Sequence, residues 1–255
     1  MKKRVAIVAL ALLLAAGTAS ANILTFKLNY FVPRLTGDFW EIEFQNMSLK
    51  KTNFQDTSFG LFYEAFLTKE FSLVLGVEAY SKNKGGFYQD WVGLDFGSEG
   101  EFAFPGSEFQ GDFNPSHSIY YSVTPIQVSF KFAPLGRRGR IIPYIGGGVN
   151  ATIWSLRMMG DMIDFNDEYV FEDAYGEVAI YPIYSVDARE GDGLGKISFG
   201  WQAFGGVMIP IANRLTIDVG GQYMSANGKF TQGFEGFQPI DLGGFHISLG
   251  INYWF

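Results

Sequence analysis

Apolar and polar side chains alternate with a period of two along most of this chain, which is the pattern of a β-strand with two different faces. The segment 57–67 shows the alternation clearly. One of its faces carries large apolar side chains: Phe59, Leu61, Tyr63, Ala65 and Leu67. The other face is mixed: Ser58, Gly60, Phe62, Glu64 and Phe66. The segment 71–80 repeats the pattern after a short link, so the two segments predict a β-hairpin.

Eight segments alternate in this way and are predicted to be antiparallel strands: 24–31, 57–67, 71–80, 119–132, 141–156, 196–211, 214–224 and 242–255. Three of the links between them are short: 68–70, 133–140 and 212–213. The other four are long: 33–56, 81–118, 157–195 and 225–241. Short and long links in alternation are typical of an up-and-down transmembrane β-barrel with short periplasmic turns and long extracellular loops. The predicted fold is therefore all-β, with eight strands.

Two kinds of protein use strands with one apolar face. A water-soluble β-sandwich turns that face inward and a polar, charged face to water. Here the apolar face is uniformly large and aromatic, whereas the opposite face is mostly Gly, Ser and Gln with a few charges. This distribution of side chains between the two faces favours a barrel whose apolar face contacts lipid. The composition agrees, with 32 glycines and 17% aromatic residues.

The start of the chain has the pattern of a secretory signal peptide. A positively charged beginning precedes an apolar run over 5–16 and small residues at 19–21. This run is shorter than the roughly 20 residues of a membrane-spanning helix, although an uncleaved anchor is the alternative. We predict a signal peptide over 1–21 and one outer-membrane β-barrel domain over 22–255, with the mature chain located in the cell outer membrane.

Charge and cysteine content exclude several classes of function. The net charge is −7, whereas nucleic-acid binding needs a basic surface, so we expect no nucleic-acid partner. The chain has no cysteine and therefore no disulfide. His117 is placed at a loop end, too isolated to share a metal with His246, and we expect no metal and no cofactor. The acidic segment 157–195 lacks the ligand spacing of a calcium loop, which favours a solvated loop.

The C-terminus resembles the assembly signal of outer-membrane β-barrels. Its characteristic places hold a polar residue, a glycine and two aromatic residues: Ser248, Gly250, Tyr253 and Phe255. The resemblance implies that the barrel-assembly machinery recognises the last strand, with periplasmic chaperones as earlier partners. If Phe255 faces lipid, alternation places Tyr253 and Ile251 there as well, and puts Asn252 and Gly250 in the lumen.

The same alternation places few charged or titratable side chains inside the barrel: Lys27, Glu64, Glu78, Lys131, Asp218 and His246. Four of them lie near periplasmic strand ends and are predicted to form a charge-paired base: Lys27, Glu64, Lys131 and Asp218. Glu78 and His246 should lie near mid-depth. An eight-stranded barrel is only wide enough for its own side chains, so we expect a polar core in preference to a conducting pore.

A catalytic role has one weak signal. His246 and Ser248 resemble the His-x-Ser pair of the lipid A deacylase barrels. That family needs a carboxylate downstream to orient the histidine, and nothing acidic follows Ser248 here. We therefore interpret the pair as a coincidence and assign no catalytic residues.

The order of segments resembles the small outer-membrane barrels typified by outer-membrane protein W and by the barrel half of outer-membrane protein A. The resemblance rests on four stretches: 27–33 with Gly37-Asp38-Phe39-Trp40, Phe130-Lys131-Phe132, Pro143-Tyr144-Ile145-Gly146-Gly147-Gly148, and the terminal strand. Proteins near protein W are linked to uptake of small hydrophobic molecules through an apolar lumen that opens sideways. Five aromatic side chains could form such an apolar lining here: Phe62, Phe66, Tyr80, Trp154 and Phe204.

Three functions follow from these observations. The leading hypothesis is a non-enzymatic barrel with a filled lumen, structural or interacting through its long loops, with outer-membrane lipid and lipopolysaccharide as partners. The alternative is porin-like or protein W-like passive transport of small hydrophobic molecules. A lipid A-modifying enzyme is the third. A continuous apolar cavity would favour transport, and packed ion pairs across the lumen would favour the first.

Overall fold

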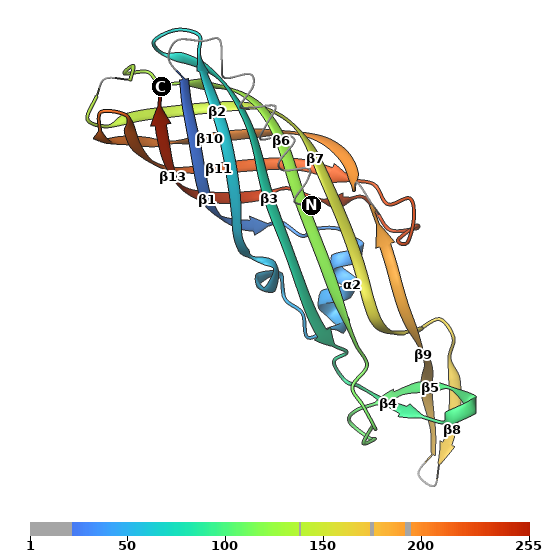
Figure 1. The fold of residues 1–255 in the computed structure, drawn as a ribbon. Coiled ribbons are helices and arrows are strands. Elements are labelled where there is room, and N and C mark those ends of the chain that lie inside the picture. The colour runs from blue at the N-terminus through green and yellow to red at the C-terminus, as the bar shows by residue number, and fades with distance from the viewer. Residues whose placement is uncertain (1–21, 138, 174–175, 192–194) are drawn as a thin grey trace.

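The computed structural model describes residues 22–137, 139–173, 176–191 and 195–255. The predicted signal peptide lies outside the described residues. Figure 1 shows long, tilted strands arranged side by side as a tube, with a smaller group of strands extending beyond one end. None of the described helices is long and apolar enough to cross a membrane.

Eight strands form the wall of the tube: β1 (Asn22–Pro33), β2 (Asp56–Phe66), β3 (Phe71–Phe87), β6 (Ser116–Phe132), β7 (Ile142–Ile163), β10 (Lys196–Ala212), β11 (Leu215–Gly228) and β13 (Gly244–Trp254). Each strand pairs antiparallel with its neighbour in this order. β1 also pairs with β13, from Ile23 opposite Trp254 to Pro33 opposite Gly244. This last pairing closes the barrel, and the predicted eight-stranded antiparallel fold is confirmed.

The two ends of the barrel differ as the link lengths indicated. Links 67–70, 133–141 and 213–214 lie at the same end as Asn22 and Phe255, which we call the turn end. The backbone N–H of Phe255 donates to the Asn22 carbonyl there at 3.0 Å. The other end carries the four long connections, and we call it the loop end.

The outer surface of the barrel is an apolar belt. Phe255 and its alternate neighbours point outward, with Ile251 58% exposed and Phe255 59% exposed. Phe130 of β6, which lies across the barrel from β13, is 62% exposed, and Phe199 of β10 is 81% exposed. An apolar surface that encircles a closed barrel is stable in lipid and not in water. The chain is a transmembrane β-barrel, and the predicted phase of its last strand is confirmed.

The long links are more ordered than the sequence predicted. They contain five further strands: β4 (Trp91–Asp95), β5 (Glu101–Pro105), β8 (Tyr169–Asp173), β9 (Gly176–Glu190) and β12 (Ile240–Asp241). They also contain three helices: α2 (Asp38–Asn46), η2 (Lys51–Phe54) and η3 (Gly97–Glu99). The prediction that the solvated segment 157–195 is a loop is wrong, because most of its described residues belong to strands. β7 continues to Ile163 and pairs with β9, which also pairs with β5 and β8.

β12 pairs with β11, whereas the other four extra strands form an arm beyond the loop end (Figure 1). Their acidic residues interrupt the apolar alternation, so periodicity alone does not reveal them. The same holds for the last third of β3, where small and charged residues from Ser81 to Gly86 pair with β6. Backbone hydrogen bonds to a neighbouring strand hold such a segment in the sheet whatever its side chains are.

Candidate functional site

The lumen contains an ion-pair cluster near the turn end. Lys131 Nζ lies 2.8 Å from Glu64 Oε2, and the two side chains come from β6 and β2. Glu64 Oε1 accepts a hydrogen bond from the Ser72 hydroxyl at 2.6 Å and lies 3.3 Å from Arg137 Nη2. Because all three charged side chains are buried, the carboxylate compensates two cations that would otherwise lack a counter-ion.

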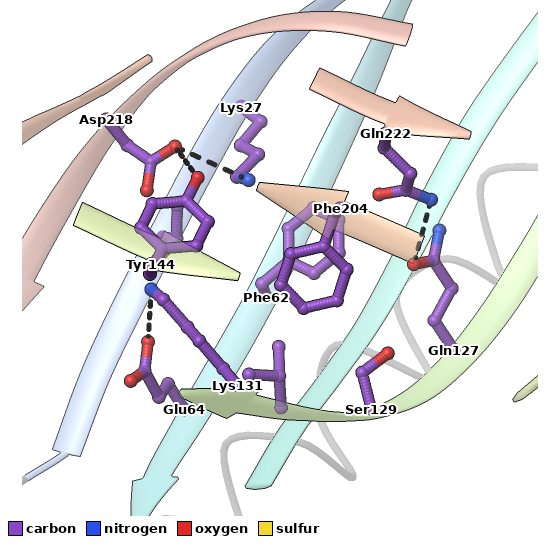
Figure 2. A pocket seen from close by; sticks show the side chains of 12 residues that line it. Lys27, Phe62, Glu64, Gln127, Ser129, Lys131, Tyr144, Phe204, Asp218 and Gln222 are labelled. Atoms are coloured by element: carbon purple, nitrogen blue, oxygen red, sulfur yellow. Dashed lines mark hydrogen bonds and ion pairs between the residues drawn. The ribbon is translucent and has the colours of Figure 1, made fainter. Parts of the chain in front are cut away.

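A second pair lies beside the first, as Figure 2 shows. Lys27 Nζ is 3.5 Å from Asp218 Oδ1, and the Tyr144 hydroxyl donates to the same oxygen at 2.7 Å. Lys131 Nζ lies 4.1 Å from the centre of the Tyr144 ring. The structure thus brings the four residues expected at the base into two pairs, with Tyr144 between them.

Sequence reasoning missed two members of this cluster. Arg137 belongs to the turn between β6 and β7, yet its guanidinium reaches Glu64 inside the lumen. It also packs over the Phe66 ring, 4.0 Å from the ring centre. Tyr144 could have been placed in the lumen, because it shares the inward phase of Gly146 and Gly148. Its hydrogen-bond partner, Asp218, depends on the packing across the lumen and is not indicated by the strand pattern.

A layer of amides surrounds Glu78 at mid-depth. Its carboxylate accepts hydrogen bonds from Asn29 Nδ2 at 3.0 Å and from Gln127 Nε2 at 3.1 Å. Gln127 in turn accepts from Gln222 Nε2 at 3.1 Å. His246 Nδ1 lies 3.7 Å from Glu78, and the imidazole stacks on Phe31 with ring centres 4.3 Å apart. Glu78 and His246 therefore lie together, one level above the base.

These side chains leave little free space. The cavity between the two ion pairs and the amide layer holds about 30 Å³. The rings of Phe62 and Phe204 fill its centre (Figure 2). A water molecule needs roughly 10–15 Å³ of such volume, so this cavity has room for about two.

The five aromatic side chains expected to line one apolar lumen lie at three different levels. Phe62 and Phe204 border the small cavity. Phe66 lies at the turn end, with its ring centre 5.7 Å from that of Trp254. Tyr80 and Trp154 belong to an apolar cluster at the loop end. The structure does not bring them into a single continuous pocket.

This loop-end cluster closes the barrel above the amide layer. Trp40 of α2 is fully buried and packs edge-on against Phe54 and Tyr121, with ring centres 5.0 and 5.8 Å away. Below them, the ring centre of Tyr80 is 4.8 Å from that of Phe31, which covers His246. Helix α2 therefore packs into the loop end of the barrel and closes it, and we call it the plug helix.

A larger cleft of about 500 Å³ lies on the outer side of the plug helix, between this helix and the arm. Its lining is rich in Met and Phe: Phe39, Met47, Met158, Met162, Phe165 and Phe234. His117, which the sequence placed alone at a loop end, is buried in β6 and contacts Glu43 beside this cleft, with Nε2 2.7 Å from Oε2. The apolar cluster separates the cleft from the cavity in the lumen.

The solved structures that the chain is similar to are outer-membrane barrels. The crystal structure of Neisserial surface protein A is 9% identical, with 92% of this chain and 98% of that chain covered and a TM-score of 0.44. The outer membrane protein OprG from Pseudomonas aeruginosa is 12% identical, with 93% of this chain and 96% of that chain covered and a TM-score of 0.48. Ail of Yersinia pestis, solved in complex with the heparin analogue sucrose octasulfate, is 10% identical, with 93% of this chain and 100% of that chain covered and a TM-score of 0.42.

The chain has the fold of a small outer-membrane β-barrel. At these identities the similarity concerns architecture alone, and the strand pairing and the apolar belt described above establish that architecture independently. No protein-family profile matches the sequence, and a search of curated proteins finds no match.

The His-x-Ser pair of this barrel lies inside the lumen. His246 and Ser248 are 3% and 6% exposed and point away from lipid. A carboxylate does approach the histidine, but it is Glu78 of β3, not a downstream residue. Among the described residues, neither ring nitrogen of His246 has a hydrogen-bond partner.

The residues of the expected assembly signal divide between the two faces of β13 and its end. Ser248 and Gly250 point into the lumen, and Tyr253 and Phe255 point outward. This distribution follows directly from alternation along the strand.

Proposed function

We propose that the protein is a non-enzymatic, integral outer-membrane barrel with a closed lumen that acts through its surface. The supporting observation is the filled interior: paired charges, hydrogen-bonded amides and an aromatic layer follow one another, with about 30 Å³ of cavity among them. Such a barrel is a rigid anchor in lipid that presents its loop end to the outside.

This proposal includes the route and the surroundings of the protein. Residues 1–21 direct export and are removed, and the terminal strand is recognised by the barrel-assembly machinery after periplasmic chaperones have delivered the chain. Outer-membrane lipid and lipopolysaccharide surround the mature barrel. The phase of Phe255 supports this arrangement, because an outward aromatic side chain at the strand end is accessible before the barrel closes.

Planar-bilayer recording of the refolded protein tests the closed lumen. We expect no stable openings, because the described side chains of the two ion pairs and the amide layer leave only about 30 Å³ between them. A matched variant, Phe62→Ala with Phe204→Ala, removes the two rings that fill the cavity and should increase brief current events. Stable openings of the unaltered protein would overturn the proposal.

Passive transport of small hydrophobic molecules is the second candidate, and the Met- and Phe-rich cleft at the loop end is the observation that favours it. Binding in this cleft and passage through the barrel are separate properties. Uptake of an apolar fluorescent dye into vesicles that contain the protein distinguishes them. We expect binding without uptake, since the buried Trp40 cluster closes the way from the cleft to the lumen.

A further inference from the structure

The cleft between the plug helix and the arm contains acidic side chains and no cationic one. It is bordered by Glu43 of α2 and by Asp164, which follows β7. Among the described residues that line it there is no lysine, arginine or histidine. The rest of the lining is mostly apolar, and the volume of about 500 Å³ is within the range of small-molecule sites, roughly 300–1,000 Å³. The cleft therefore has room for a drug-sized molecule.

One oxygen of Glu43 is free to accept a hydrogen bond in this cleft. Glu43 is only 8% exposed, and its Oε2 lies 2.7 Å from His117 Nε2. Its Oε1 accepts no hydrogen bond from the described part of the chain, yet it is not among the polar atoms that the fold closes off from solvent. A nearly buried carboxylate with a free oxygen is stabilised by a further donor, because an unpaired acceptor costs free energy. That donor has to come from the cleft.

The neighbouring histidine adds no net positive charge to the cleft. His117 Nδ1 lies 3.1 Å from the backbone oxygen of Asp161. Because a carbonyl oxygen only accepts, Nδ1 carries a hydrogen, and one further proton is shared between Nε2 and Glu43. The pair of His117 and Glu43 is therefore neutral as a whole. The carboxylate of Asp164 accepts only from the backbone N–H and the side-chain amide of Asn166, at 3.0 and 3.3 Å, so its negative charge is not compensated.

Aromatic rings line the cleft in two groups. Phe39 belongs to the first, with its ring centre 5.3 Å from that of Phe234 and 5.6 Å from that of Phe237. Tyr88 and Phe165 form the second, with ring centres 6.3 Å apart. The face of an aromatic ring attracts a cation, and the flexible methionines of the lining adapt to apolar groups of different shapes. Rings and carboxylates therefore favour the same sign of charge in a ligand.

We propose that this cleft binds an organic cation, namely a protonated amine on an aromatic or branched apolar body. The ammonium group donates to Glu43 Oε1 and is attracted by Asp164, and the apolar body lies among the rings and methionines. A neutral molecule of the same shape lacks the charge-assisted hydrogen bond, and an anion is repelled. The inference rests on the second candidate function only for binding in the cleft. It needs neither passage through the barrel nor a closed lumen, so stable openings in a bilayer would leave it intact.

Three naphthalene compounds of similar size test this preference: naphthylmethylamine, naphthylmethanol and naphthoate. Each is titrated calorimetrically at neutral pH into phosphatidylcholine nanodiscs that contain the refolded protein, with empty nanodiscs as the blank. We expect the amine to bind about tenfold more tightly than the alcohol, as a hydrogen bond to a charged group predicts, and the acid to bind most weakly. Equal affinities of the amine and the alcohol, or no binding of the amine, would overturn the proposal.

Two variants locate the site. Glu43→Gln and Asp164→Asn should each reduce the advantage of the amine over the alcohol, the first to about twofold, since an amide still accepts a hydrogen bond but carries no charge. Unchanged binding of the alcohol shows that the cleft is still formed, and if Glu43→Gln loses the alcohol as well, Asp164→Asn decides alone.

The matched control is Glu108→Gln, at an exposed position outside the cleft, which should keep the full advantage of the amine. An advantage that persists in Glu43→Gln and Asp164→Asn, or that decreases equally in the control, would overturn the proposal. Heat-modifiable migration on an unboiled gel shows separately whether each variant forms the barrel.

Discussion

Lys131 Nζ lies 2.8 Å from Glu64 Oε2 in the interior of the barrel, and Arg137 reaches the other oxygen of the same carboxylate. One acidic side chain thus compensates two cations in a space where water is scarce. The arrangement fixes the positions of β2, β6 and the turn that follows β6. It explains why the turn end of the lumen is closed although its side chains are polar.

Replacement of Glu64 by Gln should destabilise the folded barrel, because Lys131 and Arg137 would remain buried without a counter-charge. Breaking a buried ion pair on one side typically costs about 3–5 kcal/mol. We expect a decrease of about 3 kcal/mol in the free energy of unfolding, measured by urea titration in micelles. The control Glu99→Gln, at an exposed position, should change it by less than about 0.5 kcal/mol. A decrease below about 1 kcal/mol for Glu64→Gln would contradict this account.

The packing of Phe62 over two glycines predicts a specific clash. A Cβ atom at Gly76 would lie 2.2 Å from Phe62 Cδ1, and one at Gly60 would lie 2.6 Å from Phe62 Cε2. Gly76→Ala should therefore cost about 1–3 kcal/mol of folding free energy, as overpacked cores do. Combining it with Phe62→Leu should recover part of this loss.

The same strand offers the control for this experiment. A Cβ at Gly85 would meet its nearest neighbour only at 3.7 Å, an ordinary contact distance. Gly85→Ala should leave the urea midpoint unchanged or raise it slightly, since alanine reduces the entropy of the unfolded chain. Equal destabilisation by Gly76→Ala and Gly85→Ala would show that the Phe62 contact is not the cause.

The cleft at the loop end should respond to alkaline pH through Tyr88. Burial, together with repulsion from Glu43 and Asp161, raises the pKa of Tyr88 to about 12. The hydrogen bond from the backbone N–H of Ile163 lowers this pKa in part, because it favours the ionised form. The unfolded phenol ionises near pH 10. Because the folded pKa is the higher one, stability is complete below pH 10 and decreases as the pH rises from 10 to 12.

Absorbance at 295 nm and urea titration measure these two effects. The tyrosinate step near pH 12 should be smaller by one residue in Tyr88→Phe. The difference in unfolding free energy between pH 10 and pH 12 should also be smaller in this variant. An unchanged titration curve would mean that Tyr88 ionises with the exposed tyrosines.

Phe255→Ala should affect assembly more than stability. The side chain is 59% exposed on the lipid face, so its removal leaves no cavity inside the folded barrel. We expect a several-fold lower yield of heat-modifiable protein in outer-membrane fractions, with nearly unchanged urea resistance after refolding. Phe199→Ala, which removes a lipid-facing ring far from the terminus, is the control and should assemble normally. Equal yields of both variants would argue against an assembly signal.

Cells that produce His246→Ala should contain the same lipid A as cells that produce the unaltered protein. The imidazole is sealed between Phe31 and Glu78, with no access to lipid from the outer face. Mass spectrometry of lipid A from the two strains and from one without the protein provides the comparison. A mass shift that depends on the protein and disappears in His246→Ala would establish the enzyme hypothesis in place of the closed barrel.

Alternation along the chain was sufficient for the wall of the barrel. Because side chains of a strand point to opposite faces in turn, the large apolar row that includes Phe255 had to face lipid once the strands closed. The same rule placed Lys27, Glu64 and Asp218 inside. These inferences depend on each strand alone, and therefore need no knowledge of its neighbours.

Other features depend on how the strands are staggered against one another. The pairing of Lys27 with Asp218 and of Lys131 with Glu64, and the contact of Glu78 with His246, follow from the register across the lumen, which no single strand specifies. Arg137 reaches inward from a turn because the turn folds back over the opening.

The formation of the arm and the position of the plug helix at the loop end also depend on tertiary structure. The charges along β9 hide its alternation, and only its backbone pairing with β7 makes it a strand. Trp40 looks like any aromatic residue of a long link until α2 packs against Tyr121. A two-residue period reports which face of a strand is apolar. It carries no information on which distant side chain will lie opposite, because that is settled by the closure of the barrel and the packing of its ends.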